Sequence, residues 1–308
     1  GYRYANDAGE SPENAVAPRR YLLGERSRER DLDGAPHSAP GPIPWRIPGS
    51  ELNRYVRDSH SKKFRPGYDL TLRPPKSVSV LWALGGPEIA EHVKAAHEAA
   101  VDEVVAYVEQ HVVRAREPKT GRRLRTDGVI AAAFDHRTSR AGDPLLHTHV
   151  VTANMTRFLD PTGEVQWRGV ESSALFDHAR SGGFLYQAHL RHELARRLGV
   201  RFTDAVHGYA EIEGVPVDVI DRFSKRRHEI EEELAATGRS SAKSAQVVTL
   251  ETRKAKDYSV DADTLVERWR VEAAEVGFDQ AAAVACTGHE RPEGWTAADG
   301  QELLDMLA

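Results

Sequence analysis

The stretch 143–154, which reads DPLLHTHVVTAN, constrains the fold more than any other part of the chain. Successive side chains of a β-strand point to opposite faces of the sheet, so residues two apart share a face. His147 and His149 would therefore lie side by side, while Leu146 and Val150 would point to the opposite face. This pattern predicts a half-buried strand that presents two imidazoles on one side.

A third histidine lies close enough in sequence to join this pair. Residues 129–134 read as a strand that leads into His136, and the turn at 139–144 would connect it to the strand of His147 and His149. Three neutral imidazoles that converge on one point suit a divalent metal ion with positions left open for substrate. The spacing alone also fits three unrelated polar residues on half-exposed strands, because a His-x-His pair is a weak motif.

The rest of the chain alternates between strand and helix patterns. Alternating apolar residues predict a strand at 68–72, and 77–82 is an extended or helix-starting run. A helix is predicted over 87–113, with His92 and His97 facing solvent or lying at the edge of the core. The further predicted elements are a basic hairpin at 114–125 and a strand at 163–167, followed by short strands and a turn over 200–202, 208–212 and 215–217. Helices are predicted at 177–197, 217–236, 245–255 and 260–275.

Composition excludes several classes of protein. No apolar run approaches the roughly 20 residues that span a bilayer, so membrane insertion is not expected. The single cysteine, Cys286, rules out an internal disulfide framework and fits a reducing cytoplasm. The net charge is −5, so any contact with nucleic acid must come from local basic patches. Residues 31–48 are rich in Gly, Pro and Ser and read as a long loop.

Several motifs in a fixed order resemble those of one enzyme family. The matching stretches are 65–71 (RPGYDLT), 75–79 (PKSVS), 134–140 (FDHRTSR), 147–149 (HTH) with Asn154, 214–217 (GVPV) and 252–254 (TRK). Together they resemble the conjugative relaxases of the TraI/TrwC (MobF) type, which belong to the HUH endonuclease superfamily. The resemblance covers roughly residues 65–275 well and the first sixty poorly.

The resemblance implies an α/β fold. It would be a two-layer palm whose central antiparallel sheet carries the HUH histidines, with helices on one face and helical C-terminal fingers that close over DNA. The relaxase domain would span 1–285, with 1–64 loop-rich and poorly matched. Residues 286–308 would form a helical linker toward a possible C-terminal helicase.

The resemblance also implies an activity and residues for it. The activity is site- and strand-specific nicking and rejoining of DNA at an origin of transfer, through a 5′-phosphotyrosine adduct. His136, His147 and His149 would hold a divalent ion, Mg or Mn above others such as Zn or Ni. Asp69 would accept the proton of the tyrosine or orient a metal-bound histidine. The sequence has no Tyr-Tyr pair near its start, so the candidate nucleophiles are Tyr2, Tyr4 and Tyr21, with Tyr2 preferred.

Basic residues near these motifs are candidates for contact with DNA phosphates. They are Lys62, Lys63, Arg65, Arg73, Lys76, Arg122, Arg123, Arg253 and Lys254. The expected partners are single-stranded DNA at the origin of transfer with an adjacent hairpin, accessory proteins of the relaxosome, and secretion coupling proteins. The expected location is the bacterial cytoplasm.

Two alternatives stay open on the sequence. A rolling-circle replication initiator would share the metal site and the tyrosine chemistry, although the order of the later motifs argues against it. A single-stranded DNA-binding module that lacks a nucleophile would explain the missing Tyr-Tyr pair.

Overall fold

The structure is a computed structural model that describes residues 19–21, 65–117, 120–160, 162–238, 248 and 260–290. Its strands are β1 (Arg19–Tyr21), β2 (Gly67–Leu72), β3 (Arg114–Arg116), β4 (Arg123–Arg125), β5 (Ala131–Thr138), β6 (Pro144–Ala153), β7 (Thr156–Leu159) and β8 (Val165–Arg168). Its helices are α2 (Lys76–Leu84), α3 (Pro87–Tyr107), η1 (Val108–Val112), α4 (Ser172–Leu198), α5 (Val217–Arg222), α6 (Lys225–Thr237), α8 (Ala262–Ala274) and α9 (Gln280–Ala285).

The central sheet has the strand order β1-β5-β6-β2, and each pair of neighbouring strands is antiparallel. In β6, buried and half-buried residues alternate along the whole strand, which is the pattern of a sheet covered on one face only. Leu146 and Val150 lie on the covered face, and His147 and His149 lie on the open face. The predicted antiparallel sheet that carries the histidines is confirmed.

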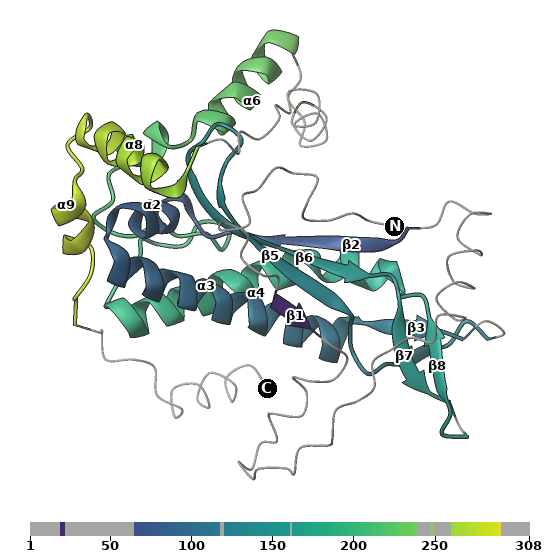
Figure 1. The fold of residues 1–308 in the computed structure, drawn as a ribbon. Coiled ribbons are helices and arrows are strands. Elements are labelled where there is room, and N and C mark those ends of the chain that lie inside the picture. Colours follow the sequence, from purple (N-terminus) through teal and green to yellow (C-terminus); the bar gives the residue numbers. More distant parts are fainter. Residues whose placement is uncertain are drawn as a thin grey trace.

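Helices α3 and α4 run side by side along the covered face, as Figure 1 shows. The buried stripe of α3 includes Val93, Ala100 and Val104, which recur at helical spacing. The sheet and these two helices make the two layers of the predicted palm. The helix predicted over 87–113 is confirmed, although its last turn is the π-helix η1. The helix predicted over 177–197 begins earlier, at Ser172.

The ambiguous run 77–82 belongs to helix α2. The alternation of serine and valine resembles the pattern of a half-buried strand. In the helix, however, both serines are buried as deeply as the valines. The Ser79 hydroxyl accepts a hydrogen bond from the backbone N–H of Leu146 at 3.2 Å, and the Ser77 hydroxyl accepts one from that of Ile212 at 2.8 Å. These serines therefore attach α2 to β6 and to the loop before α5.

Two short antiparallel ribbons extend the sheet at one end (Figure 1). The predicted basic hairpin is the ribbon of β3 and β4, and the strand predicted at 163–167 is β8. Strand β7, the partner of β8, was not predicted. Between 200 and 217 the predicted turn is present, but the predicted short strands are not formed. That segment forms only isolated bridges between Phe202 and Ile212 and between Val206 and Tyr209.

The C-terminal part of the described chain is helical. Helix α6 projects beyond the sheet (Figure 1), and Lys225 at its start lies 2.5 Å from Glu272 of α8. These helices follow the sheet in the chain, as the resemblance implied for the fingers. The helix predicted at 245–255 lies outside the described residues except for Val248, which is helical and buried. The start of the predicted linker packs on the domain, because Cys286 is buried and the backbone N–H of Gly288 donates to the carbonyl of Leu198 at 2.8 Å. Residues 291–308 lie outside the described part.

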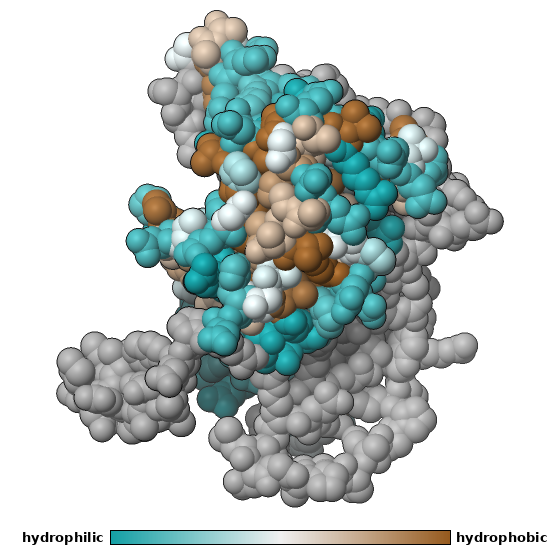
Figure 2. Space-filling view, turned by 90° about the vertical axis from the view of Figure 1, so that its left-hand side faces the viewer, coloured by the Kyte–Doolittle hydropathy of each residue, from teal (hydrophilic) through white to brown (hydrophobic). Residues whose placement is uncertain are grey.

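Figure 2 views the side of the molecule where α8 and α9 lie, and hydrophobic and hydrophilic residues are mixed over its surface. The exposed apolar side chains of these helices include Val271 and Val284. Single exposed apolar residues are normal on a protein surface and indicate no partner by themselves. In the described part of the chain, no helix has both the length and the apolar character that crossing a membrane requires.

Candidate metal centre

Three histidines meet on the open face of the sheet. In the register of β5 and β6, His136 lies opposite His147, and Phe134 lies opposite His149. The imidazole centroids of the three histidines are 5.0, 5.0 and 5.2 Å apart. One ring nitrogen from each histidine lies within 4.8 Å of those from the other two. The structure thus brings together the triad that the sequence predicted.

Hydrogen bonds fix which ring nitrogen of two histidines faces the centre. Nδ1 of His149 lies 2.8 and 3.0 Å from the two carboxylate oxygens of Asp69, and Nδ1 of His147 lies 2.9 Å from the carbonyl oxygen of Leu145. Because carboxylates and carbonyls only accept, each Nδ1 must carry the proton and donate it. The lone pair of each neutral ring is then on Nε2, which is the nitrogen that would bind a metal.

The donor set fits a divalent cation. Neutral imidazoles do not reduce the charge of a bound cation, and the three histidines are half-buried, which leaves access from solvent. A carboxylate behind a histidine is a common means of orienting a metal-bound ring. Asp69 occupies that position behind His149, on β2, opposite Val151.

Thr71 is a contact that the sequence did not predict. It lies opposite His149 in the register of β2 and β6, and its hydroxyl is 3.1 Å from Nδ1 of His149. It shares the open face with Asp69 because the two residues are two apart on β2. That spacing was the available signal, since the matched motif contains both residues.

The predicted tyrosines are only partly described. Tyr2 and Tyr4 lie outside the described residues. Tyr21 lies in β1, where its backbone pairs with Ala131 of β5, the strand that also carries His136.

The predicted DNA contacts fall into three groups. Lys62, Lys63, Arg253 and Lys254 lie outside the described residues. Arg65 and Arg73 are exposed, and the Arg65 guanidinium lies 5.7 Å from the ring centre of Phe176. The remaining three, Lys76, Arg122 and Arg123, make contacts within the protein.

Lys76 contributes to the fold at the start of β6. Its Nζ donates to the carbonyl oxygen of Pro144 at 3.0 Å. Burial lowers the pKa of Lys76 to about 8, and the nearby carboxylate of Asp143 opposes this shift. Asp143 is itself buried, and burial raises its pKa although Lys225 of α6 lies 3.4 Å from its Oδ1. Whether Lys76 also reaches DNA stays a prediction.

Arg122 and Arg123 differ in their surroundings although they are neighbours. Arg123 lies 2.8 Å from Glu171, and the same carboxylate accepts from Arg116 at 2.6 Å. These hydrogen bonds, with Arg116 first, hold the pKa of Glu171 down at about 2. Arg122 lies farther from its acidic neighbour, with 3.7 Å between its Nε and Glu117. Arg122 is therefore the more available of the two for another anion.

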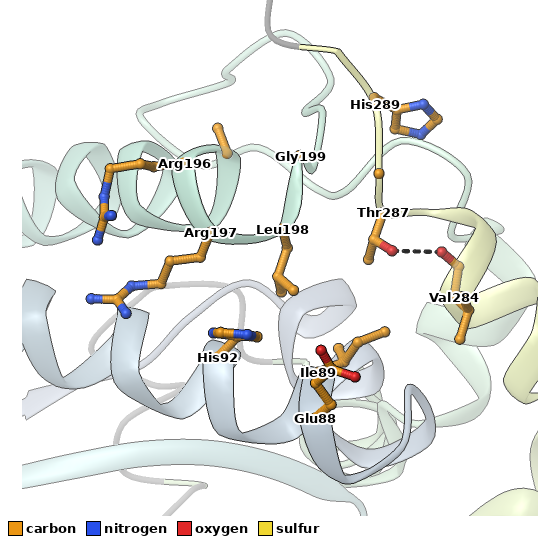
Figure 3. A pocket seen from close by; sticks show the side chains of 12 residues that line it. Glu88, Ile89, His92, Arg196, Arg197, Leu198, Gly199, Val284, Thr287 and His289 are labelled. Carbon is orange, nitrogen blue, oxygen red and sulfur yellow. Dashed lines mark hydrogen bonds between the residues drawn. The ribbon is translucent and has the colours of Figure 1, made fainter.

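A pocket of about 520 Å³ lies apart from the triad, between the start of α3 and the end of α4 (Figure 3). His92 faces Arg197 across it. Arg196 and Arg197 are both paired with Glu193, at 2.7 and 2.8 Å, which compensates their charge. None of its described lining residues belongs to the predicted site.

Comparison with known proteins identifies the family. The model of the TrwC relaxase family matches residues 10–276. The chain belongs to the TrwC relaxase family. The match begins at residue 10 and therefore includes most of the N-terminal region in which the motifs alone gave little resemblance.

Curated relatives in the TrwC relaxase family are much longer than this chain. The multifunctional conjugation protein TraI of Escherichia coli is 37% identical over 247 residues, which cover 76% of this chain and 13% of TraI. A second TraI, from strain K12, is 36% identical over the same length and coverage. The chain thus spans about an eighth of these relatives.

Solved structures of the TrwC relaxase itself share the fold. A copper-bound complex of TrwC with oriT DNA superposes with a TM-score of 0.63 at 33% identity, covering 70% of this chain and 72% of TrwC. A complex with a 27-mer DNA that comprises the recognition hairpin and the cleavage site gives 0.61 at 34% identity, covering 70% and 75%. A further complex with oriT DNA is metal-bound and gives 0.62 at 34% identity, covering 70% and 73%. The DNA and the metal in these complexes are bound to TrwC.

Proposed function

We propose that this chain nicks one DNA strand at an origin of transfer and later rejoins it, through a covalent tyrosine adduct. The observation that carries the proposal is the convergence of His136, His147 and His149, with Asp69 behind His149, in a chain of the TrwC relaxase family. The match to relaxases and the order of the motifs favour this function over a rolling-circle initiator.

The reaction divides into attack and release. A tyrosine gives up its phenolic proton to water and its oxygen attacks the phosphorus. The bond from phosphorus to the 3′ oxygen breaks, and the leaving 3′ oxygen takes up a proton from water. The product is a 5′-phosphotyrosine diester and a free 3′ hydroxyl, so the reverse attack by a 3′ hydroxyl reseals DNA. A divalent cation on the three histidines would supply positive charge next to the non-bridging phosphate oxygens.

The protein groups hold this arrangement. The three imidazoles would hold the cation, and the contact of Asp69 with Nδ1 of His149 would orient that ring so that Nε2 faces the centre. The contact between Asp69 and His149 supports an orienting role for Asp69 over that of base toward the tyrosine. The candidate nucleophiles remain Tyr2, preferred, then Tyr4 and Tyr21. Tyr21 is supported by its place on β1, beside the strand of His136.

The substrate and partners follow from the family. We infer that single-stranded DNA with an adjacent hairpin binds over the open face, between the sheet and the helices that follow it. Accessory relaxosome and secretion coupling proteins would act with it in the bacterial cytoplasm. The cation would be Mg or Mn, since an anionic substrate brings oxygen ligands of its own. The predicted phosphate contacts are Lys62, Lys63, Arg65, Arg73, Lys76, Arg122, Arg123, Arg253 and Lys254.

One assay tests the proposal. Labelled single strands that tile the intergenic DNA beside the gene are incubated with the protein and Mn²⁺, and covalent adducts are resolved on a denaturing gel. We expect an adduct with one strand only, lost on addition of a chelator. Phenylalanine at Tyr2, Tyr4 or Tyr21 identifies the nucleophile. Binding without any adduct would replace this proposal with that of a DNA-binding module.

A further inference from the structure

A chain of buried polar residues lies directly behind the three histidines. Thr148, between His147 and His149, points to the covered face, and its hydroxyl contacts Asp135 of β5 at 2.5 Å and Nε2 of His97 of α3 at 2.7 Å. Nδ1 of His97 lies 2.6 Å from the hydroxyl of Tyr186 in α4. His97, Thr148 and Tyr186 are at most 1% exposed. His97, predicted at the solvent or the core edge, instead lies inside the core.

The direction of each hydrogen bond follows from the groups involved. The carboxylate of Asp135 accepts, so Thr148 donates its proton to Asp135. The oxygen of Thr148 then accepts from Nε2–H of His97, whose Nδ1 accepts from the hydroxyl of Tyr186. Burial raises the pKa of Tyr186 well above its usual value, which keeps this donor protonated. With His97 neutral, each of these three contacts has one donor and one acceptor.

This chain connects four elements at the level of the metal centre. Asp135 precedes His136, and Thr148 has a metal-site histidine on each side. Around it the core consists mainly of valine, alanine and leucine, such as Val93, Ala96 and Leu190. Burying polar groups in such a core costs free energy unless every group is paired, and a fully paired network holds one geometry strongly. The two polar residues that the strands contribute, Asp135 and Thr148, are next to the histidines that must be aligned.

We propose that Thr148 and His97 are positioning residues for the metal centre, which hold β5 and β6 so that three imidazole nitrogens converge. The inference rests on the proposed metal centre. Because the side chains on the two faces share one backbone, a shift of Thr148 toward another partner would rotate its neighbours His147 and His149. The hydroxyl of Tyr186 donates to Nδ1 of His97, which places the ring proton on Nε2. Nε2–H can then donate to the hydroxyl oxygen of Thr148.

The first test replaces the hydroxyl of Thr148 and measures cation binding by calorimetry with Mn²⁺ and by the visible spectrum of Co²⁺. We expect Thr148→Val to weaken the affinity ~10-fold, the lower range for residues that support metal ligands. Thr148→Ser, which keeps the hydroxyl, should restore it. Thr156→Val is the matched control, since Thr156 is equally buried and donates to the carbonyl of Gly128 at 2.7 Å in another part of the fold. It should lower the melting temperature with unchanged cation affinity.

A second pair of variants, at His97, tests the same inference if Thr148→Val fails to fold. His97→Gln offers one donor and one acceptor and should bind the cation nearly as wild type does, whereas His97→Leu should bind it ~10-fold more weakly. Equal affinities for wild type, Thr148→Val and His97→Leu would overturn the inference. Wild-type protein that binds the cation but forms no DNA adduct would overturn the proposed function and leave the positioning role supported. Wild-type protein that binds no cation would overturn both.

Discussion

The carboxylate of Asp69 lies 2.8 Å from Nδ1 of His149 and joins β2 to β6 on the open face of the sheet. The contact leaves Nε2 of His149 for the metal and fixes the plane of the ring. We predict that Asp69→Asn weakens Mn²⁺ binding about 10- to 100-fold, the range found for carboxylates behind metal-bound histidines. Calorimetry measures this affinity directly.

The cation dependence of adduct formation separates the two roles considered for Asp69. An orienting role predicts that Asp69→Asn regains most of its rate at saturating Mn²⁺. A role as base predicts normal Mn²⁺ affinity and a rate that stays low at any concentration, which would contradict our assignment. Thr71→Val is the control on the same strand. Its hydroxyl is 3.1 Å from the same Nδ1, and its loss leaves the carboxylate in place, so we expect a smaller effect.

Lys76 predicts an unusual dependence of stability on alkaline pH. Burial lowers the pKa of Lys76 to about 8, below the 10.5 of the unfolded chain. As pH rises, the ammonium group therefore loses its proton at a lower pH in the folded protein than in the unfolded chain. Stability therefore rises as pH increases from 8 toward 10.5. We predict that the free energy of unfolding of wild type, relative to Lys76→Met, rises by ~2 kcal/mol between pH 7 and 10, since one pKa unit is worth about 1.4 kcal/mol. Urea unfolding followed by tryptophan fluorescence measures the difference.

Lys94→Met is the control for this series, because Lys94 is a lysine on the exposed side of α3 with 43% of its side chain accessible. The difference between wild type and Lys94→Met should not change with pH. A difference that is flat for Lys76→Met as well would show that Lys76 does not release its proton on folding.

The local part of the metal centre was predictable from the sequence, because strand alternation is a local property. His147 and His149 share a face in any β-strand, and the short turn before them returns the chain to His136. The contact between Asp69 and His149 joins residues 80 positions apart, so it depends on the pairing of β2 with β6. No pattern in the sequence specifies that pairing, and only the family resemblance brought Asp69 to the site.

The errors have a physical cause in packing between elements. Ser77 and Ser79 are buried beside valines because their hydroxyls accept hydrogen bonds from distant backbone N–H groups. The resulting alternation of serine and valine resembles that of a strand, so the sequence did not clearly predict helix α2. A polar residue on helix α3 was expected at the edge of the core, but His97 lies inside the core, where Thr148 and Tyr186 are its hydrogen-bond partners. Between 200 and 217 the apolar residues suit short strands, yet the chain turns too often there for strands to pair.

The adjacent residues Arg122 and Arg123 are both proposed to contact phosphates but should differ in how much they contribute to stability. Arg122 is 68% exposed and only loosely paired, so Arg122→Ala should remove one phosphate contact and lower the slope of log affinity against log salt by about 1. Its stability should change by less than ~0.5 kcal/mol. Arg123→Ala removes a partner of the buried Glu171 and should cost ~1 kcal/mol. Fluorescence anisotropy with single-stranded DNA and thermal unfolding measure the two effects, and the opposite pattern would contradict the assignment.

Glu171 predicts a loss of stability in acid. Hydrogen bonds from Arg116, and then from Arg123, hold its pKa at about 2, below the 4.5 of the unfolded chain. A carboxylate with a lowered folded pKa stabilises the protein above the unfolded pKa and loses that contribution as pH falls toward the folded pKa. The stability advantage of wild type over Glu171→Gln should thus be full at pH 6 and decline between pH 4.5 and about 2. Urea unfolding at pH 6, 4.5, 3.5 and 2.5 follows this decline.

Glu232→Gln, at an exposed position of α6, is the control and should track wild type at each pH. An advantage that persisted unchanged at the lowest pH would show that the stabilising role of Glu171 does not depend on its charge.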